Sequence, residues 1–320
     1  AAAVLPEDLH DLDHPTWGPT ESELAALPPL DEPAIPDTND IAPYDRAGTG
    51  DICDPDDVEA AIGFAALQRH LAGPLPLTEQ QIETQVARAI EADTSPVTPE
   101  RIVALNALAT DYFTGAFPGS WAQTYLTERL AGTDLTGHPT IRPGYAPAGW
   151  TRLIDHLGGH GASSEELLAA GLATTTRHGR LIDRFRDRLI LPITRTTATH
   201  QEQVLGFVAR RHPRHSDHTG GGPKYLNTPD TPLFHKGAQL YTTGRPGLLT
   251  EGAVPVLVEG PLDALAVTAS GAGKYVGLAP LGTALTDEQA HQLALLAHQA
   301  GTAPIVAADD DPAGEQASER

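Results

Sequence analysis

The chain has 320 residues with 42 acidic and 21 basic side chains, a formal net charge of −21, and this length allows two or three domains with a buried core. It contains no apolar run of about 18 residues or more, so the sequence predicts no membrane span, and no secretion-signal pattern opens it. The single cysteine, Cys53, excludes a disulfide framework and a cysteine-based zinc ribbon, so we expect a cytoplasmic protein without zinc.

The charge is distributed unevenly along the chain. Residues 1–100 hold 21 acidic and 3 basic residues, whereas residues 141–250 hold 14 basic and 8 acidic residues. A basic central region can bind phosphates, and acidic residues near the C-terminal end can bind metal. Surface charge also varies by chance, so the asymmetry carries little weight by itself. The chain begins with Ala-Ala-Ala and lacks methionine, and we interpret it as a piece of a longer protein.

The N-terminal region is acidic and only partly helical. Residues 1–56 are rich in Pro, Asp and Glu, which indicates a linker or a loosely ordered arm. Residues 57–72 and 78–92 have the apolar spacing of amphipathic helices. Thr78 and Gln81 have the spacing of a capping box at the start of the second helix.

The central region is expected to be helical up to about residue 180 and to form strands after it. A helix is expected from Pro99, and Ser163 with Glu166 forms a capping-box pattern that begins another helix, which Gly171 ends. Two short apolar runs indicate strands of a small sheet, residues 188–194 and 203–211. The segment HSDHTGGGPKYL, residues 215–226, is expected to be a loop.

Residues 254–320 alternate between strand and helix patterns. The expected strands are residues 254–260, 274–280 and 303–311, and the expected helices are residues 261–271 and 286–301, with another beginning after residue 311. Thr286 and Gln289 have capping-box spacing, and Gly301 ends that helix. This alternation indicates a parallel α/β sheet.

Acidic residues follow two of the predicted strands. Glu259 follows the first, and Asp309 and Asp311 follow the third, at the edge where α/β proteins bind ligands. Asp309 and Asp311 are two residues apart on an extended segment, so both can face one cation, and Mg²⁺ prefers such oxygen ligands. Asp263 can support this site or can favour the start of its helix. The simpler alternative is an Asp-rich turn that ends a strand.

Three segments resemble the successive blocks of a TOPRIM domain: LVEGPLDALAV, APLGTALT and AADDDPAGEQA. DnaG-type primases, topoisomerases, recombination-repair proteins and some nucleases share this domain. The resemblance implies a Rossmann-like parallel sheet in which Glu259, Asp309 and Asp311 hold Mg²⁺ or Mn²⁺. Asp310 departs from the pattern, where the family often has glycine, and the chain ends soon after this block.

Residues 141–241 resemble the subdomain that precedes TOPRIM in DnaG-type primases, in RPGYAPAGWTRLIDHL, LIDRFRDRLILPI, VLGFVARR and PKYLNTPDTPLFHKGAQLY. The resemblance implies that a template and nucleotide groove is lined by Arg210, Lys224, Asn227 and Lys236. Arg186 and Arg188 can hold phosphates there or form structural ion pairs, and Tyr225 can stack on a base of a single strand.

These features predict a DNA primase that makes short RNA primers on single-stranded DNA by two-metal nucleotidyl transfer from ribonucleoside triphosphates. Whether this fragment is active alone stays open. One alternative is a Mg²⁺-dependent TOPRIM nuclease. Such a nuclease would not need the primase-like subdomain of residues 141–241, so this segment argues against it. Another is a non-catalytic single-stranded DNA-binding module, which would tolerate loss of the acidic residues.

The resulting fold prediction is an α+β primase subdomain followed by an α/β TOPRIM domain, after an acidic, partly helical N-terminal region. The predicted boundaries are residues 1–95, 96–248 and 249–320. The arm takes the place of the zinc ribbon that DnaG-type primases usually carry, and its charge should repel DNA. We expect the arm to dock a partner or another part of the same polypeptide. The protein is also expected to work with a replicative helicase or other modules, as a phage, plasmid or other mobile-element protein would.

Overall fold

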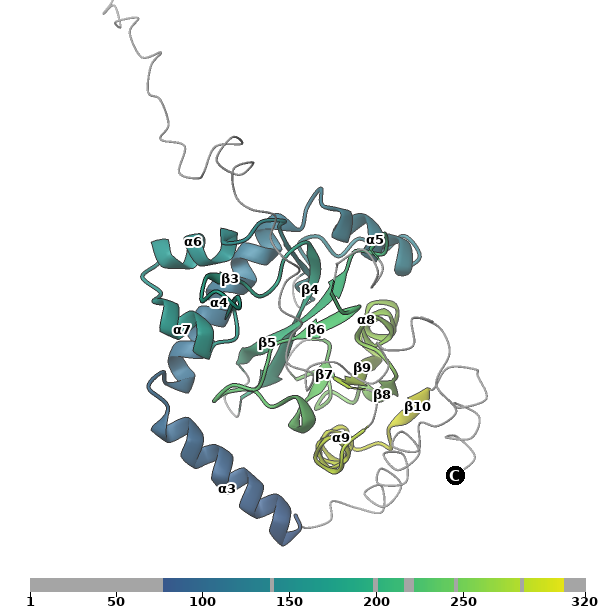
Figure 1. Cartoon of the computed structure of the whole chain (residues 1–320). Coiled ribbons are helices and arrows are strands. Elements are labelled where there is room, and N and C mark those ends of the chain that lie inside the picture. Colours follow the sequence, from purple (N-terminus) through teal and green to yellow (C-terminus); the bar gives the residue numbers. More distant parts are fainter. Residues whose placement is uncertain are drawn as a thin grey trace, which may run out of the picture. The chain divides into compact units, whose positions relative to one another are not determined.

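The computed structural model describes residues 77–138, 141–197, 201–215, 222–244, 247–282 and 285–307 (Figure 1). Helix α3 spans Glu79–Thr94, and the predicted capping box is confirmed, because Thr78 and Gln81 each bind the other's backbone N–H. Helix α4 spans Pro99–Ala116 with Thr98 as its N-cap, as predicted. The helix predicted at residues 57–72 lies outside the described residues.

Three further helices precede the first long strand: α5 (Trp121–Arg129), α6 (Arg152–Gly159) and α7 (Ser164–Ala169). The capping box of Ser163 and Glu166 is confirmed at the start of α7. Gly171 follows the end of α7 with a φ of 66°, a left-handed conformation that glycine adopts without strain.

The expectation of helical structure throughout this region was wrong at two short strands, β1 (Gly144–Ala146) and β2 (Ala173–Thr175). Strand β1 pairs with β4, more than 40 residues later in the chain, and β2 pairs with β3 (Leu181–Asp183). Gly144 allows β1 to approach α4 closely, because a Cβ at Gly144 would lie 2.6 Å from the Cβ of Phe113. Tertiary pairing therefore creates strands where the local pattern is too short to show them.

The first sheet is antiparallel and has the order β1-β4-β5-β6. Strands β4 (Arg188–Thr196) and β5 (Glu202–Arg211) confirm the two predicted apolar strands. Strand β6 (Tyr225–Asn227) corrects the loop prediction, because Tyr225 and Leu226 pair with Arg210 and Ala209 of β5. This pairing brings Tyr225 next to Arg210 at the edge of the sheet.

The second sheet has the order β10-β8-β9-β7, and its first three strands are parallel. Strands β8 (Val254–Val258), β9 (Tyr275–Pro280) and β10 (Ile305–Ala307) alternate with helices α8 (Pro261–Ser270) and α9 (Asp287–Ala300), which confirms the predicted α/β pattern. Strand β7 (Leu240–Thr242) adds an antiparallel edge to β9, after the short 3₁₀ helix η4 (Lys236–Ala238).

The two sheets share an apolar core. Phe113, Phe185 and Phe207 pack edge to face between α4 and the first sheet. The same cluster of buried side chains continues to Val258 of β8 and Leu262 of α8. None of the helices in the described ranges is long and apolar enough to cross a membrane.

Candidate active site

The parallel strands β8, β9 and β10 end at the same edge of the second sheet. The register pairs Ala307 of β10 with Val258 of β8, and Glu259 follows Val258 with an exposed side chain. Asp309 and Asp311 follow Ala307 in the sequence but lie outside the described residues. Of the three predicted metal-binding acids, the structure therefore describes only Glu259, at the edge where the sequence predicts it.

The first turn of α8 adds a second acid beside Glu259. Asp263 lies 3.4 Å from the guanidinium of Arg129, and both side chains are about half exposed. Gly260 is the N-cap of α8, and a Cβ there would lie 3.1 Å from the carboxylate of Asp263. The small residue at position 260 thus leaves room for Asp263 to turn toward the start of its helix.

Arg210 is held between two tyrosines. Its Nε donates to the hydroxyl of Tyr125 at 2.8 Å, and its guanidinium lies 5.2 Å from the ring centres of both Tyr125 and Tyr225. Both rings can hold the guanidinium by cation–π contact. The Nη1 of Arg210 is buried and has no hydrogen-bond partner among the described residues. A neighbouring side chain would have to move before this N–H group could donate to an oxygen of a bound ligand.

Burial raises the pKa of Tyr225 to about 12, although Arg210 acts in the opposite direction. The charges of Asp263 and Arg129 also affect the pKa of Tyr225. The ion pair of Asp263 and Arg129 therefore lies near Tyr225 and Arg210. Tyr225 stays protonated at neutral pH and can donate a hydrogen bond or stack on a base.

Asn227 and Lys236 approach the end of strand β9. The side-chain amide of Asn227 donates to the carbonyl of Leu281 at 2.9 Å. The Lys236 Nζ lies 3.8 Å from the position that a Cβ would occupy at Gly282. Two residues of the predicted nucleotide groove therefore lie next to the loop that follows β9.

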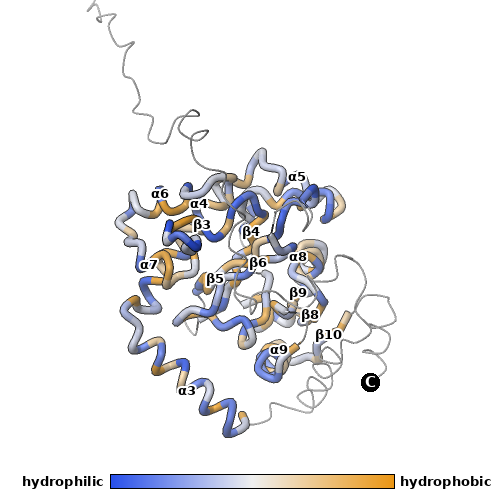
Figure 2. The backbone as a smooth tube through the Cα atoms, viewed as in Figure 1, coloured by the Kyte–Doolittle hydropathy of each residue, from blue (hydrophilic) through white to orange (hydrophobic). Residues whose placement is uncertain are grey.

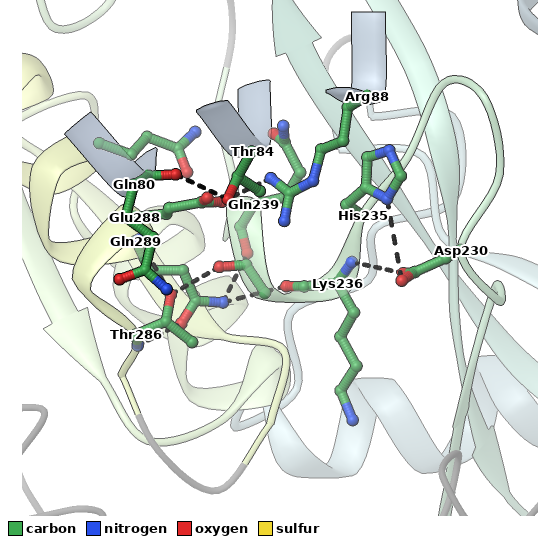
Figure 3. A network of polar contacts seen from close by, with 12 residues as sticks. Gln80, Thr84, Arg88, Asp230, His235, Lys236, Gln239, Thr286, Glu288 and Gln289 are labelled. Atoms are coloured by element: carbon green, nitrogen blue, oxygen red, sulfur yellow. Dashed lines mark hydrogen bonds and ion pairs between the residues drawn. The ribbon is translucent and has the colours of Figure 1, made fainter. Parts of the chain in front are cut away.

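The backbone around Lys236 is fixed by a polar network (Figure 3). The N–H of Lys236 donates to Asp230 at 3.0 Å, and its carbonyl accepts from Gln289 of α9 at 3.2 Å. His235, whose Nδ1 lies 3.8 Å from Asp230, lowers the pKa of Asp230. Figure 3 shows the side chain of Lys236 extending away from these partners, so the network positions the ammonium group without binding it.

Lys224 and Arg188 have different surroundings. The carbonyl of Lys224 accepts from the N–H of Arg211 at 2.9 Å, which aligns Lys224 just before β6, and its side chain is half-buried. Arg188 is only 5% exposed, and its Nη1 donates to the carbonyl of Pro223 at 2.8 Å. Arg188 thus holds the backbone directly before Lys224.

Arg186 lies in another neighbourhood. Its guanidinium is 4.8 Å from the ring centre of Trp150 and donates to the carbonyl of Asp183. Burial lowers the pKa of Arg186, and Asp183 counteracts this effect. None of these contacts involves the Glu259 edge, so the structure does not bring Arg186 together with Arg210 and Lys236.

Sequence reasoning missed Tyr125 and Arg129. Both lie on α5, four residues apart and therefore on one face of the helix, and they contact Arg210 and Asp263 respectively. The spacing of a tyrosine and an arginine at i and i+4 was the available signal, but it occurs in many ordinary helices.

The acids at the edge of the second sheet are the candidate metal ligands. Within the described ranges no group of three or more His, Cys, Asp or Glu side chains is arranged to hold a metal ion, and two of the three predicted ligands fall outside these ranges. The exposed carboxylate of Glu259 fits Mg²⁺, which prefers oxygen ligands. Asp263 already faces a cation, Arg129, which competes with a metal role.

The arrangement combines acids at a strand edge with cations and aromatic rings beside them. Such a surface can hold a polyphosphate through Arg210 and Lys236 and a base through Tyr225. Glu259, at the carboxyl end of β8, can hold the cation that phosphoryl or nucleotidyl transfer requires.

Two family models match the chain. Residues 116–245 match the N-terminal domain of the DNA primase catalytic core, and residues 256–320 match a Toprim-like domain. A DNA primase of Deinococcus radiodurans is 34% identical over 260 residues, which cover 80% of this chain and 42% of that protein. The chain thus spans less than half the length of this relative.

Solved structures agree with these matches. The RNA polymerase domain of the primase DnaG from Mycobacterium tuberculosis is 33% identical, with a TM-score of 0.56 over 69% of this chain and 70% of that domain. A DnaG primase catalytic domain bound to single-stranded DNA is 28% identical, with a TM-score of 0.52 over 69% of this chain and 64% of that structure.

Proposed function

The chain belongs to the DnaG-type primase family, and on this premise we propose that it carries the catalytic core of a DNA primase, which makes short RNA primers on single-stranded DNA. The observation that carries the proposal is that Tyr225, which contacts Arg210, lies near Asp263 in the first turn of α8, and that Lys236 lies beside Gly282 after β9. Both places belong to the carboxyl edge of the second sheet, where Glu259 follows β8. A DnaG catalytic domain similar to this chain has been solved bound to single-stranded DNA, which supports such a template here.

The roles of the residues follow from their chemistry. Arg210 and Lys236, with Lys224, bind phosphates of the incoming ribonucleoside triphosphate or of the template. Tyr225 stacks on a base, and Asn227 holds the loop after β9 in position. Arg188 holds the carbonyl of Pro223 directly before Lys224. Arg186, beside Trp150 and away from these residues, stays a predicted contact to the template. Tyr125 and Arg129 orient Arg210 and Asp263.

Glu259, Asp309 and Asp311 are the proposed ligands of Mg²⁺ or Mn²⁺, with Asp263 as a supporting acid. Held by these acids, Mg²⁺ or Mn²⁺ would supply activation of a 3′-hydroxyl and neutralisation of charge on the leaving pyrophosphate. The side chains of Arg210 and Lys236 add positive charge beside the same edge, where negative charge develops during transfer.

Primer synthesis is the test. The full chain is incubated with single-stranded DNA, labelled ribonucleotides and Mg²⁺, and RNA products are separated on a denaturing gel. Glu259→Gln, Asp309→Asn and Asp311→Asn are expected to lower primer yield on the order of 100-fold or more. The matched control is Glu251→Gln, an acid in the turn before β8, which is expected to leave the yield unchanged.

The same assay separates the alternatives. DNA cleavage that depends on Glu259 would contradict the primase and support a TOPRIM nuclease. DNA binding with no product in wild type, under conditions in which a relative makes primers, would support a binding module. The boundaries at residues 95 and 248, the cytoplasmic location, the helicase partner and the mobile-element origin remain predictions.

A further inference from the structure

Helix α3 presents its apolar side chains to solvent. Ile82, Val86 and Ile90 are 49%, 52% and 60% exposed, and they follow one another at intervals of four residues. This spacing places them along one side of the helix. Figure 2 shows orange, hydrophobic stretches along α3 between hydrophilic ones. An amphipathic helix normally turns such a stripe toward its own domain.

The opposite side of α3 faces the protein. Thr84, Arg88 and Ala92 are partly buried, and they lie about half a turn away from the apolar stripe. Arg88 forms an ion pair with Glu288 of α9 at 2.6 Å, which Figure 3 shows beside His235 and Gln239. The polar side of α3 is therefore the one anchored to the domain, and this anchoring leaves the apolar stripe outside.

The charge around the stripe has one sign. Glu79, Glu83 and Asp93 are exposed and fall on the same side of the helix as Ile82, Val86 and Ile90. The single basic residue of α3 is Arg88, which faces α9. The outward face thus combines three exposed aliphatic side chains with three carboxylates and contains no positive charge.

We propose that this outward face of α3 is a docking site for an amphipathic helix of a partner protein, with apolar side chains at matching spacing and Lys or Arg beside them. The aliphatic stripe supplies the buried contact of a helix-to-helix interface, and the carboxylates select a basic partner. This site goes beyond primer synthesis, because none of its residues belongs to the Glu259 edge.

Helix α3 is connected to the segment that carries Lys236. Glu288, the anchor of α3, begins the helix whose Gln289 holds the carbonyl of Lys236. Arg88 also contributes to lowering the pKa of Asp230, the carboxylate that accepts from the N–H of Lys236. Helix α3 alone therefore separates a partner bound to the outward face from the segment that presents Lys236.

The test uses two designed peptides and the full chain. The first is a fluorescein-labelled helix of about 18 residues with leucines at positions i, i+3, i+4 and i+7 and lysines or arginines beside them. The second has glutamate in place of every basic residue. Fluorescence anisotropy is expected to show binding of the basic peptide, with the acidic peptide at least about tenfold weaker.

Variants distinguish the contribution of the aliphatic side chains to peptide binding from that of charge attraction. The triple variant Ile82→Gln, Val86→Gln, Ile90→Gln keeps the net charge, and glutamine favours helix at least as well as these residues. It is expected to bind the basic peptide at least about tenfold more weakly. The matched control, Leu168→Gln with Leu295→Gln, changes exposed leucines of α7 and α9 and is expected to bind like wild type.

Three results would overturn the proposal. The first is a triple variant that binds the basic peptide as wild type does, because charge alone would then explain binding. The second is a wild-type chain that does not bind the basic peptide, as expected if another segment of the chain covers the stripe. The third is a wild-type chain that dimerises in light scattering while the triple variant stays monomeric.

Discussion

The side-chain amide of Asn227 donates a hydrogen bond of 2.9 Å to the carbonyl of Leu281. This bond connects the last strand of the first sheet to the residue that follows β9 of the second sheet. The carbonyl of Asn227 accepts from the Nε and Nη2 of Arg184 at 3.0 and 2.8 Å, so the residue is held from both sides. Asn227 therefore sets the distance between the groups on β6 and the strand edge.

Asn227→Ala is expected to lower the free energy of unfolding by about 1–2 kcal/mol, because it leaves the Leu281 carbonyl without its donor. Asn227→Asp should be at least as damaging, since a carboxylate cannot donate to a carbonyl. Urea denaturation gives the stabilities, and primer yield is measured on the same variants. Equal stability of Asn227→Asp and wild type would contradict this account of the bond.

Arg210→Lys is expected to weaken nucleotide binding about tenfold while the fold is retained. A lysine keeps the charge but cannot fill the space between Tyr125 and Tyr225 with a planar group. Binding of a fluorescent ribonucleotide measures the effect. The control is Arg195→Lys on β4, where the exposed arginine donates to the side-chain oxygen of Gln203. If both variants lose affinity equally, the tyrosine pair has no special role.

Gly277→Ala is expected to destabilise the second sheet by roughly 3 kcal/mol. A Cβ at Gly277 would lie 1.9 Å from the carbonyl oxygen of Ala264, so α8 would have to move away from β9. Gly115→Ala on α4 is the control, because nothing lies within 4 Å of its Cβ position. It should be neutral or stabilise by up to about 1 kcal/mol, and thermal unfolding compares the two.

The buried Asp183 predicts a dependence of stability on pH. Burial raises its pKa to about 6, although the N–H groups of Leu153 and Ile154 and the charge of Arg186 act in the other direction. Because the folded state holds this proton more tightly than the unfolded state, the contribution to stability is present below about pH 4 and is lost as the pH rises through about 6.

Asp183→Asn removes this ionisation and keeps an acceptor oxygen for the start of α6. The stability of wild type relative to this variant is expected to fall by about 2 kcal/mol between about pH 4.5 and about pH 7. Guanidinium denaturation of both proteins at the two pH values provides the measurement. A difference that does not change with pH would show that the hydrogen bonds to Asp183 outweigh its burial.

The predictable parts of the fold were those with local signals. Thr78, Ser163 and Thr286 marked helix starts correctly because a capping box closes within four residues. Strands β1 and β6 were not predictable, because each is three residues long and depends on pairing with a distant strand. Long apolar runs such as β5 carried their own signal.

The candidate site shows the same division. Glu259 was placed correctly at a strand end because a buried apolar run stops directly before it. The partners of Arg210 could not be predicted, since Tyr125 is 85 residues away and approaches it only in the folded chain. The different environments of Arg188, buried beside Pro223, and Arg186, beside Trp150, depend on tertiary packing in the same way.

Strand β7 has a consequence for exchanging parts between relatives. It forms the outer strand of the second sheet but is encoded before β8, next to the segment that carries Lys236. A chimera joined directly before β8 would take β9 from one parent and strand β7, which pairs with β9, from the other parent. An isolated second half without residues 240–242 would expose the backbone of β9, which invites edge-to-edge aggregation. Junctions placed ahead of Leu240 keep this strand with its sheet.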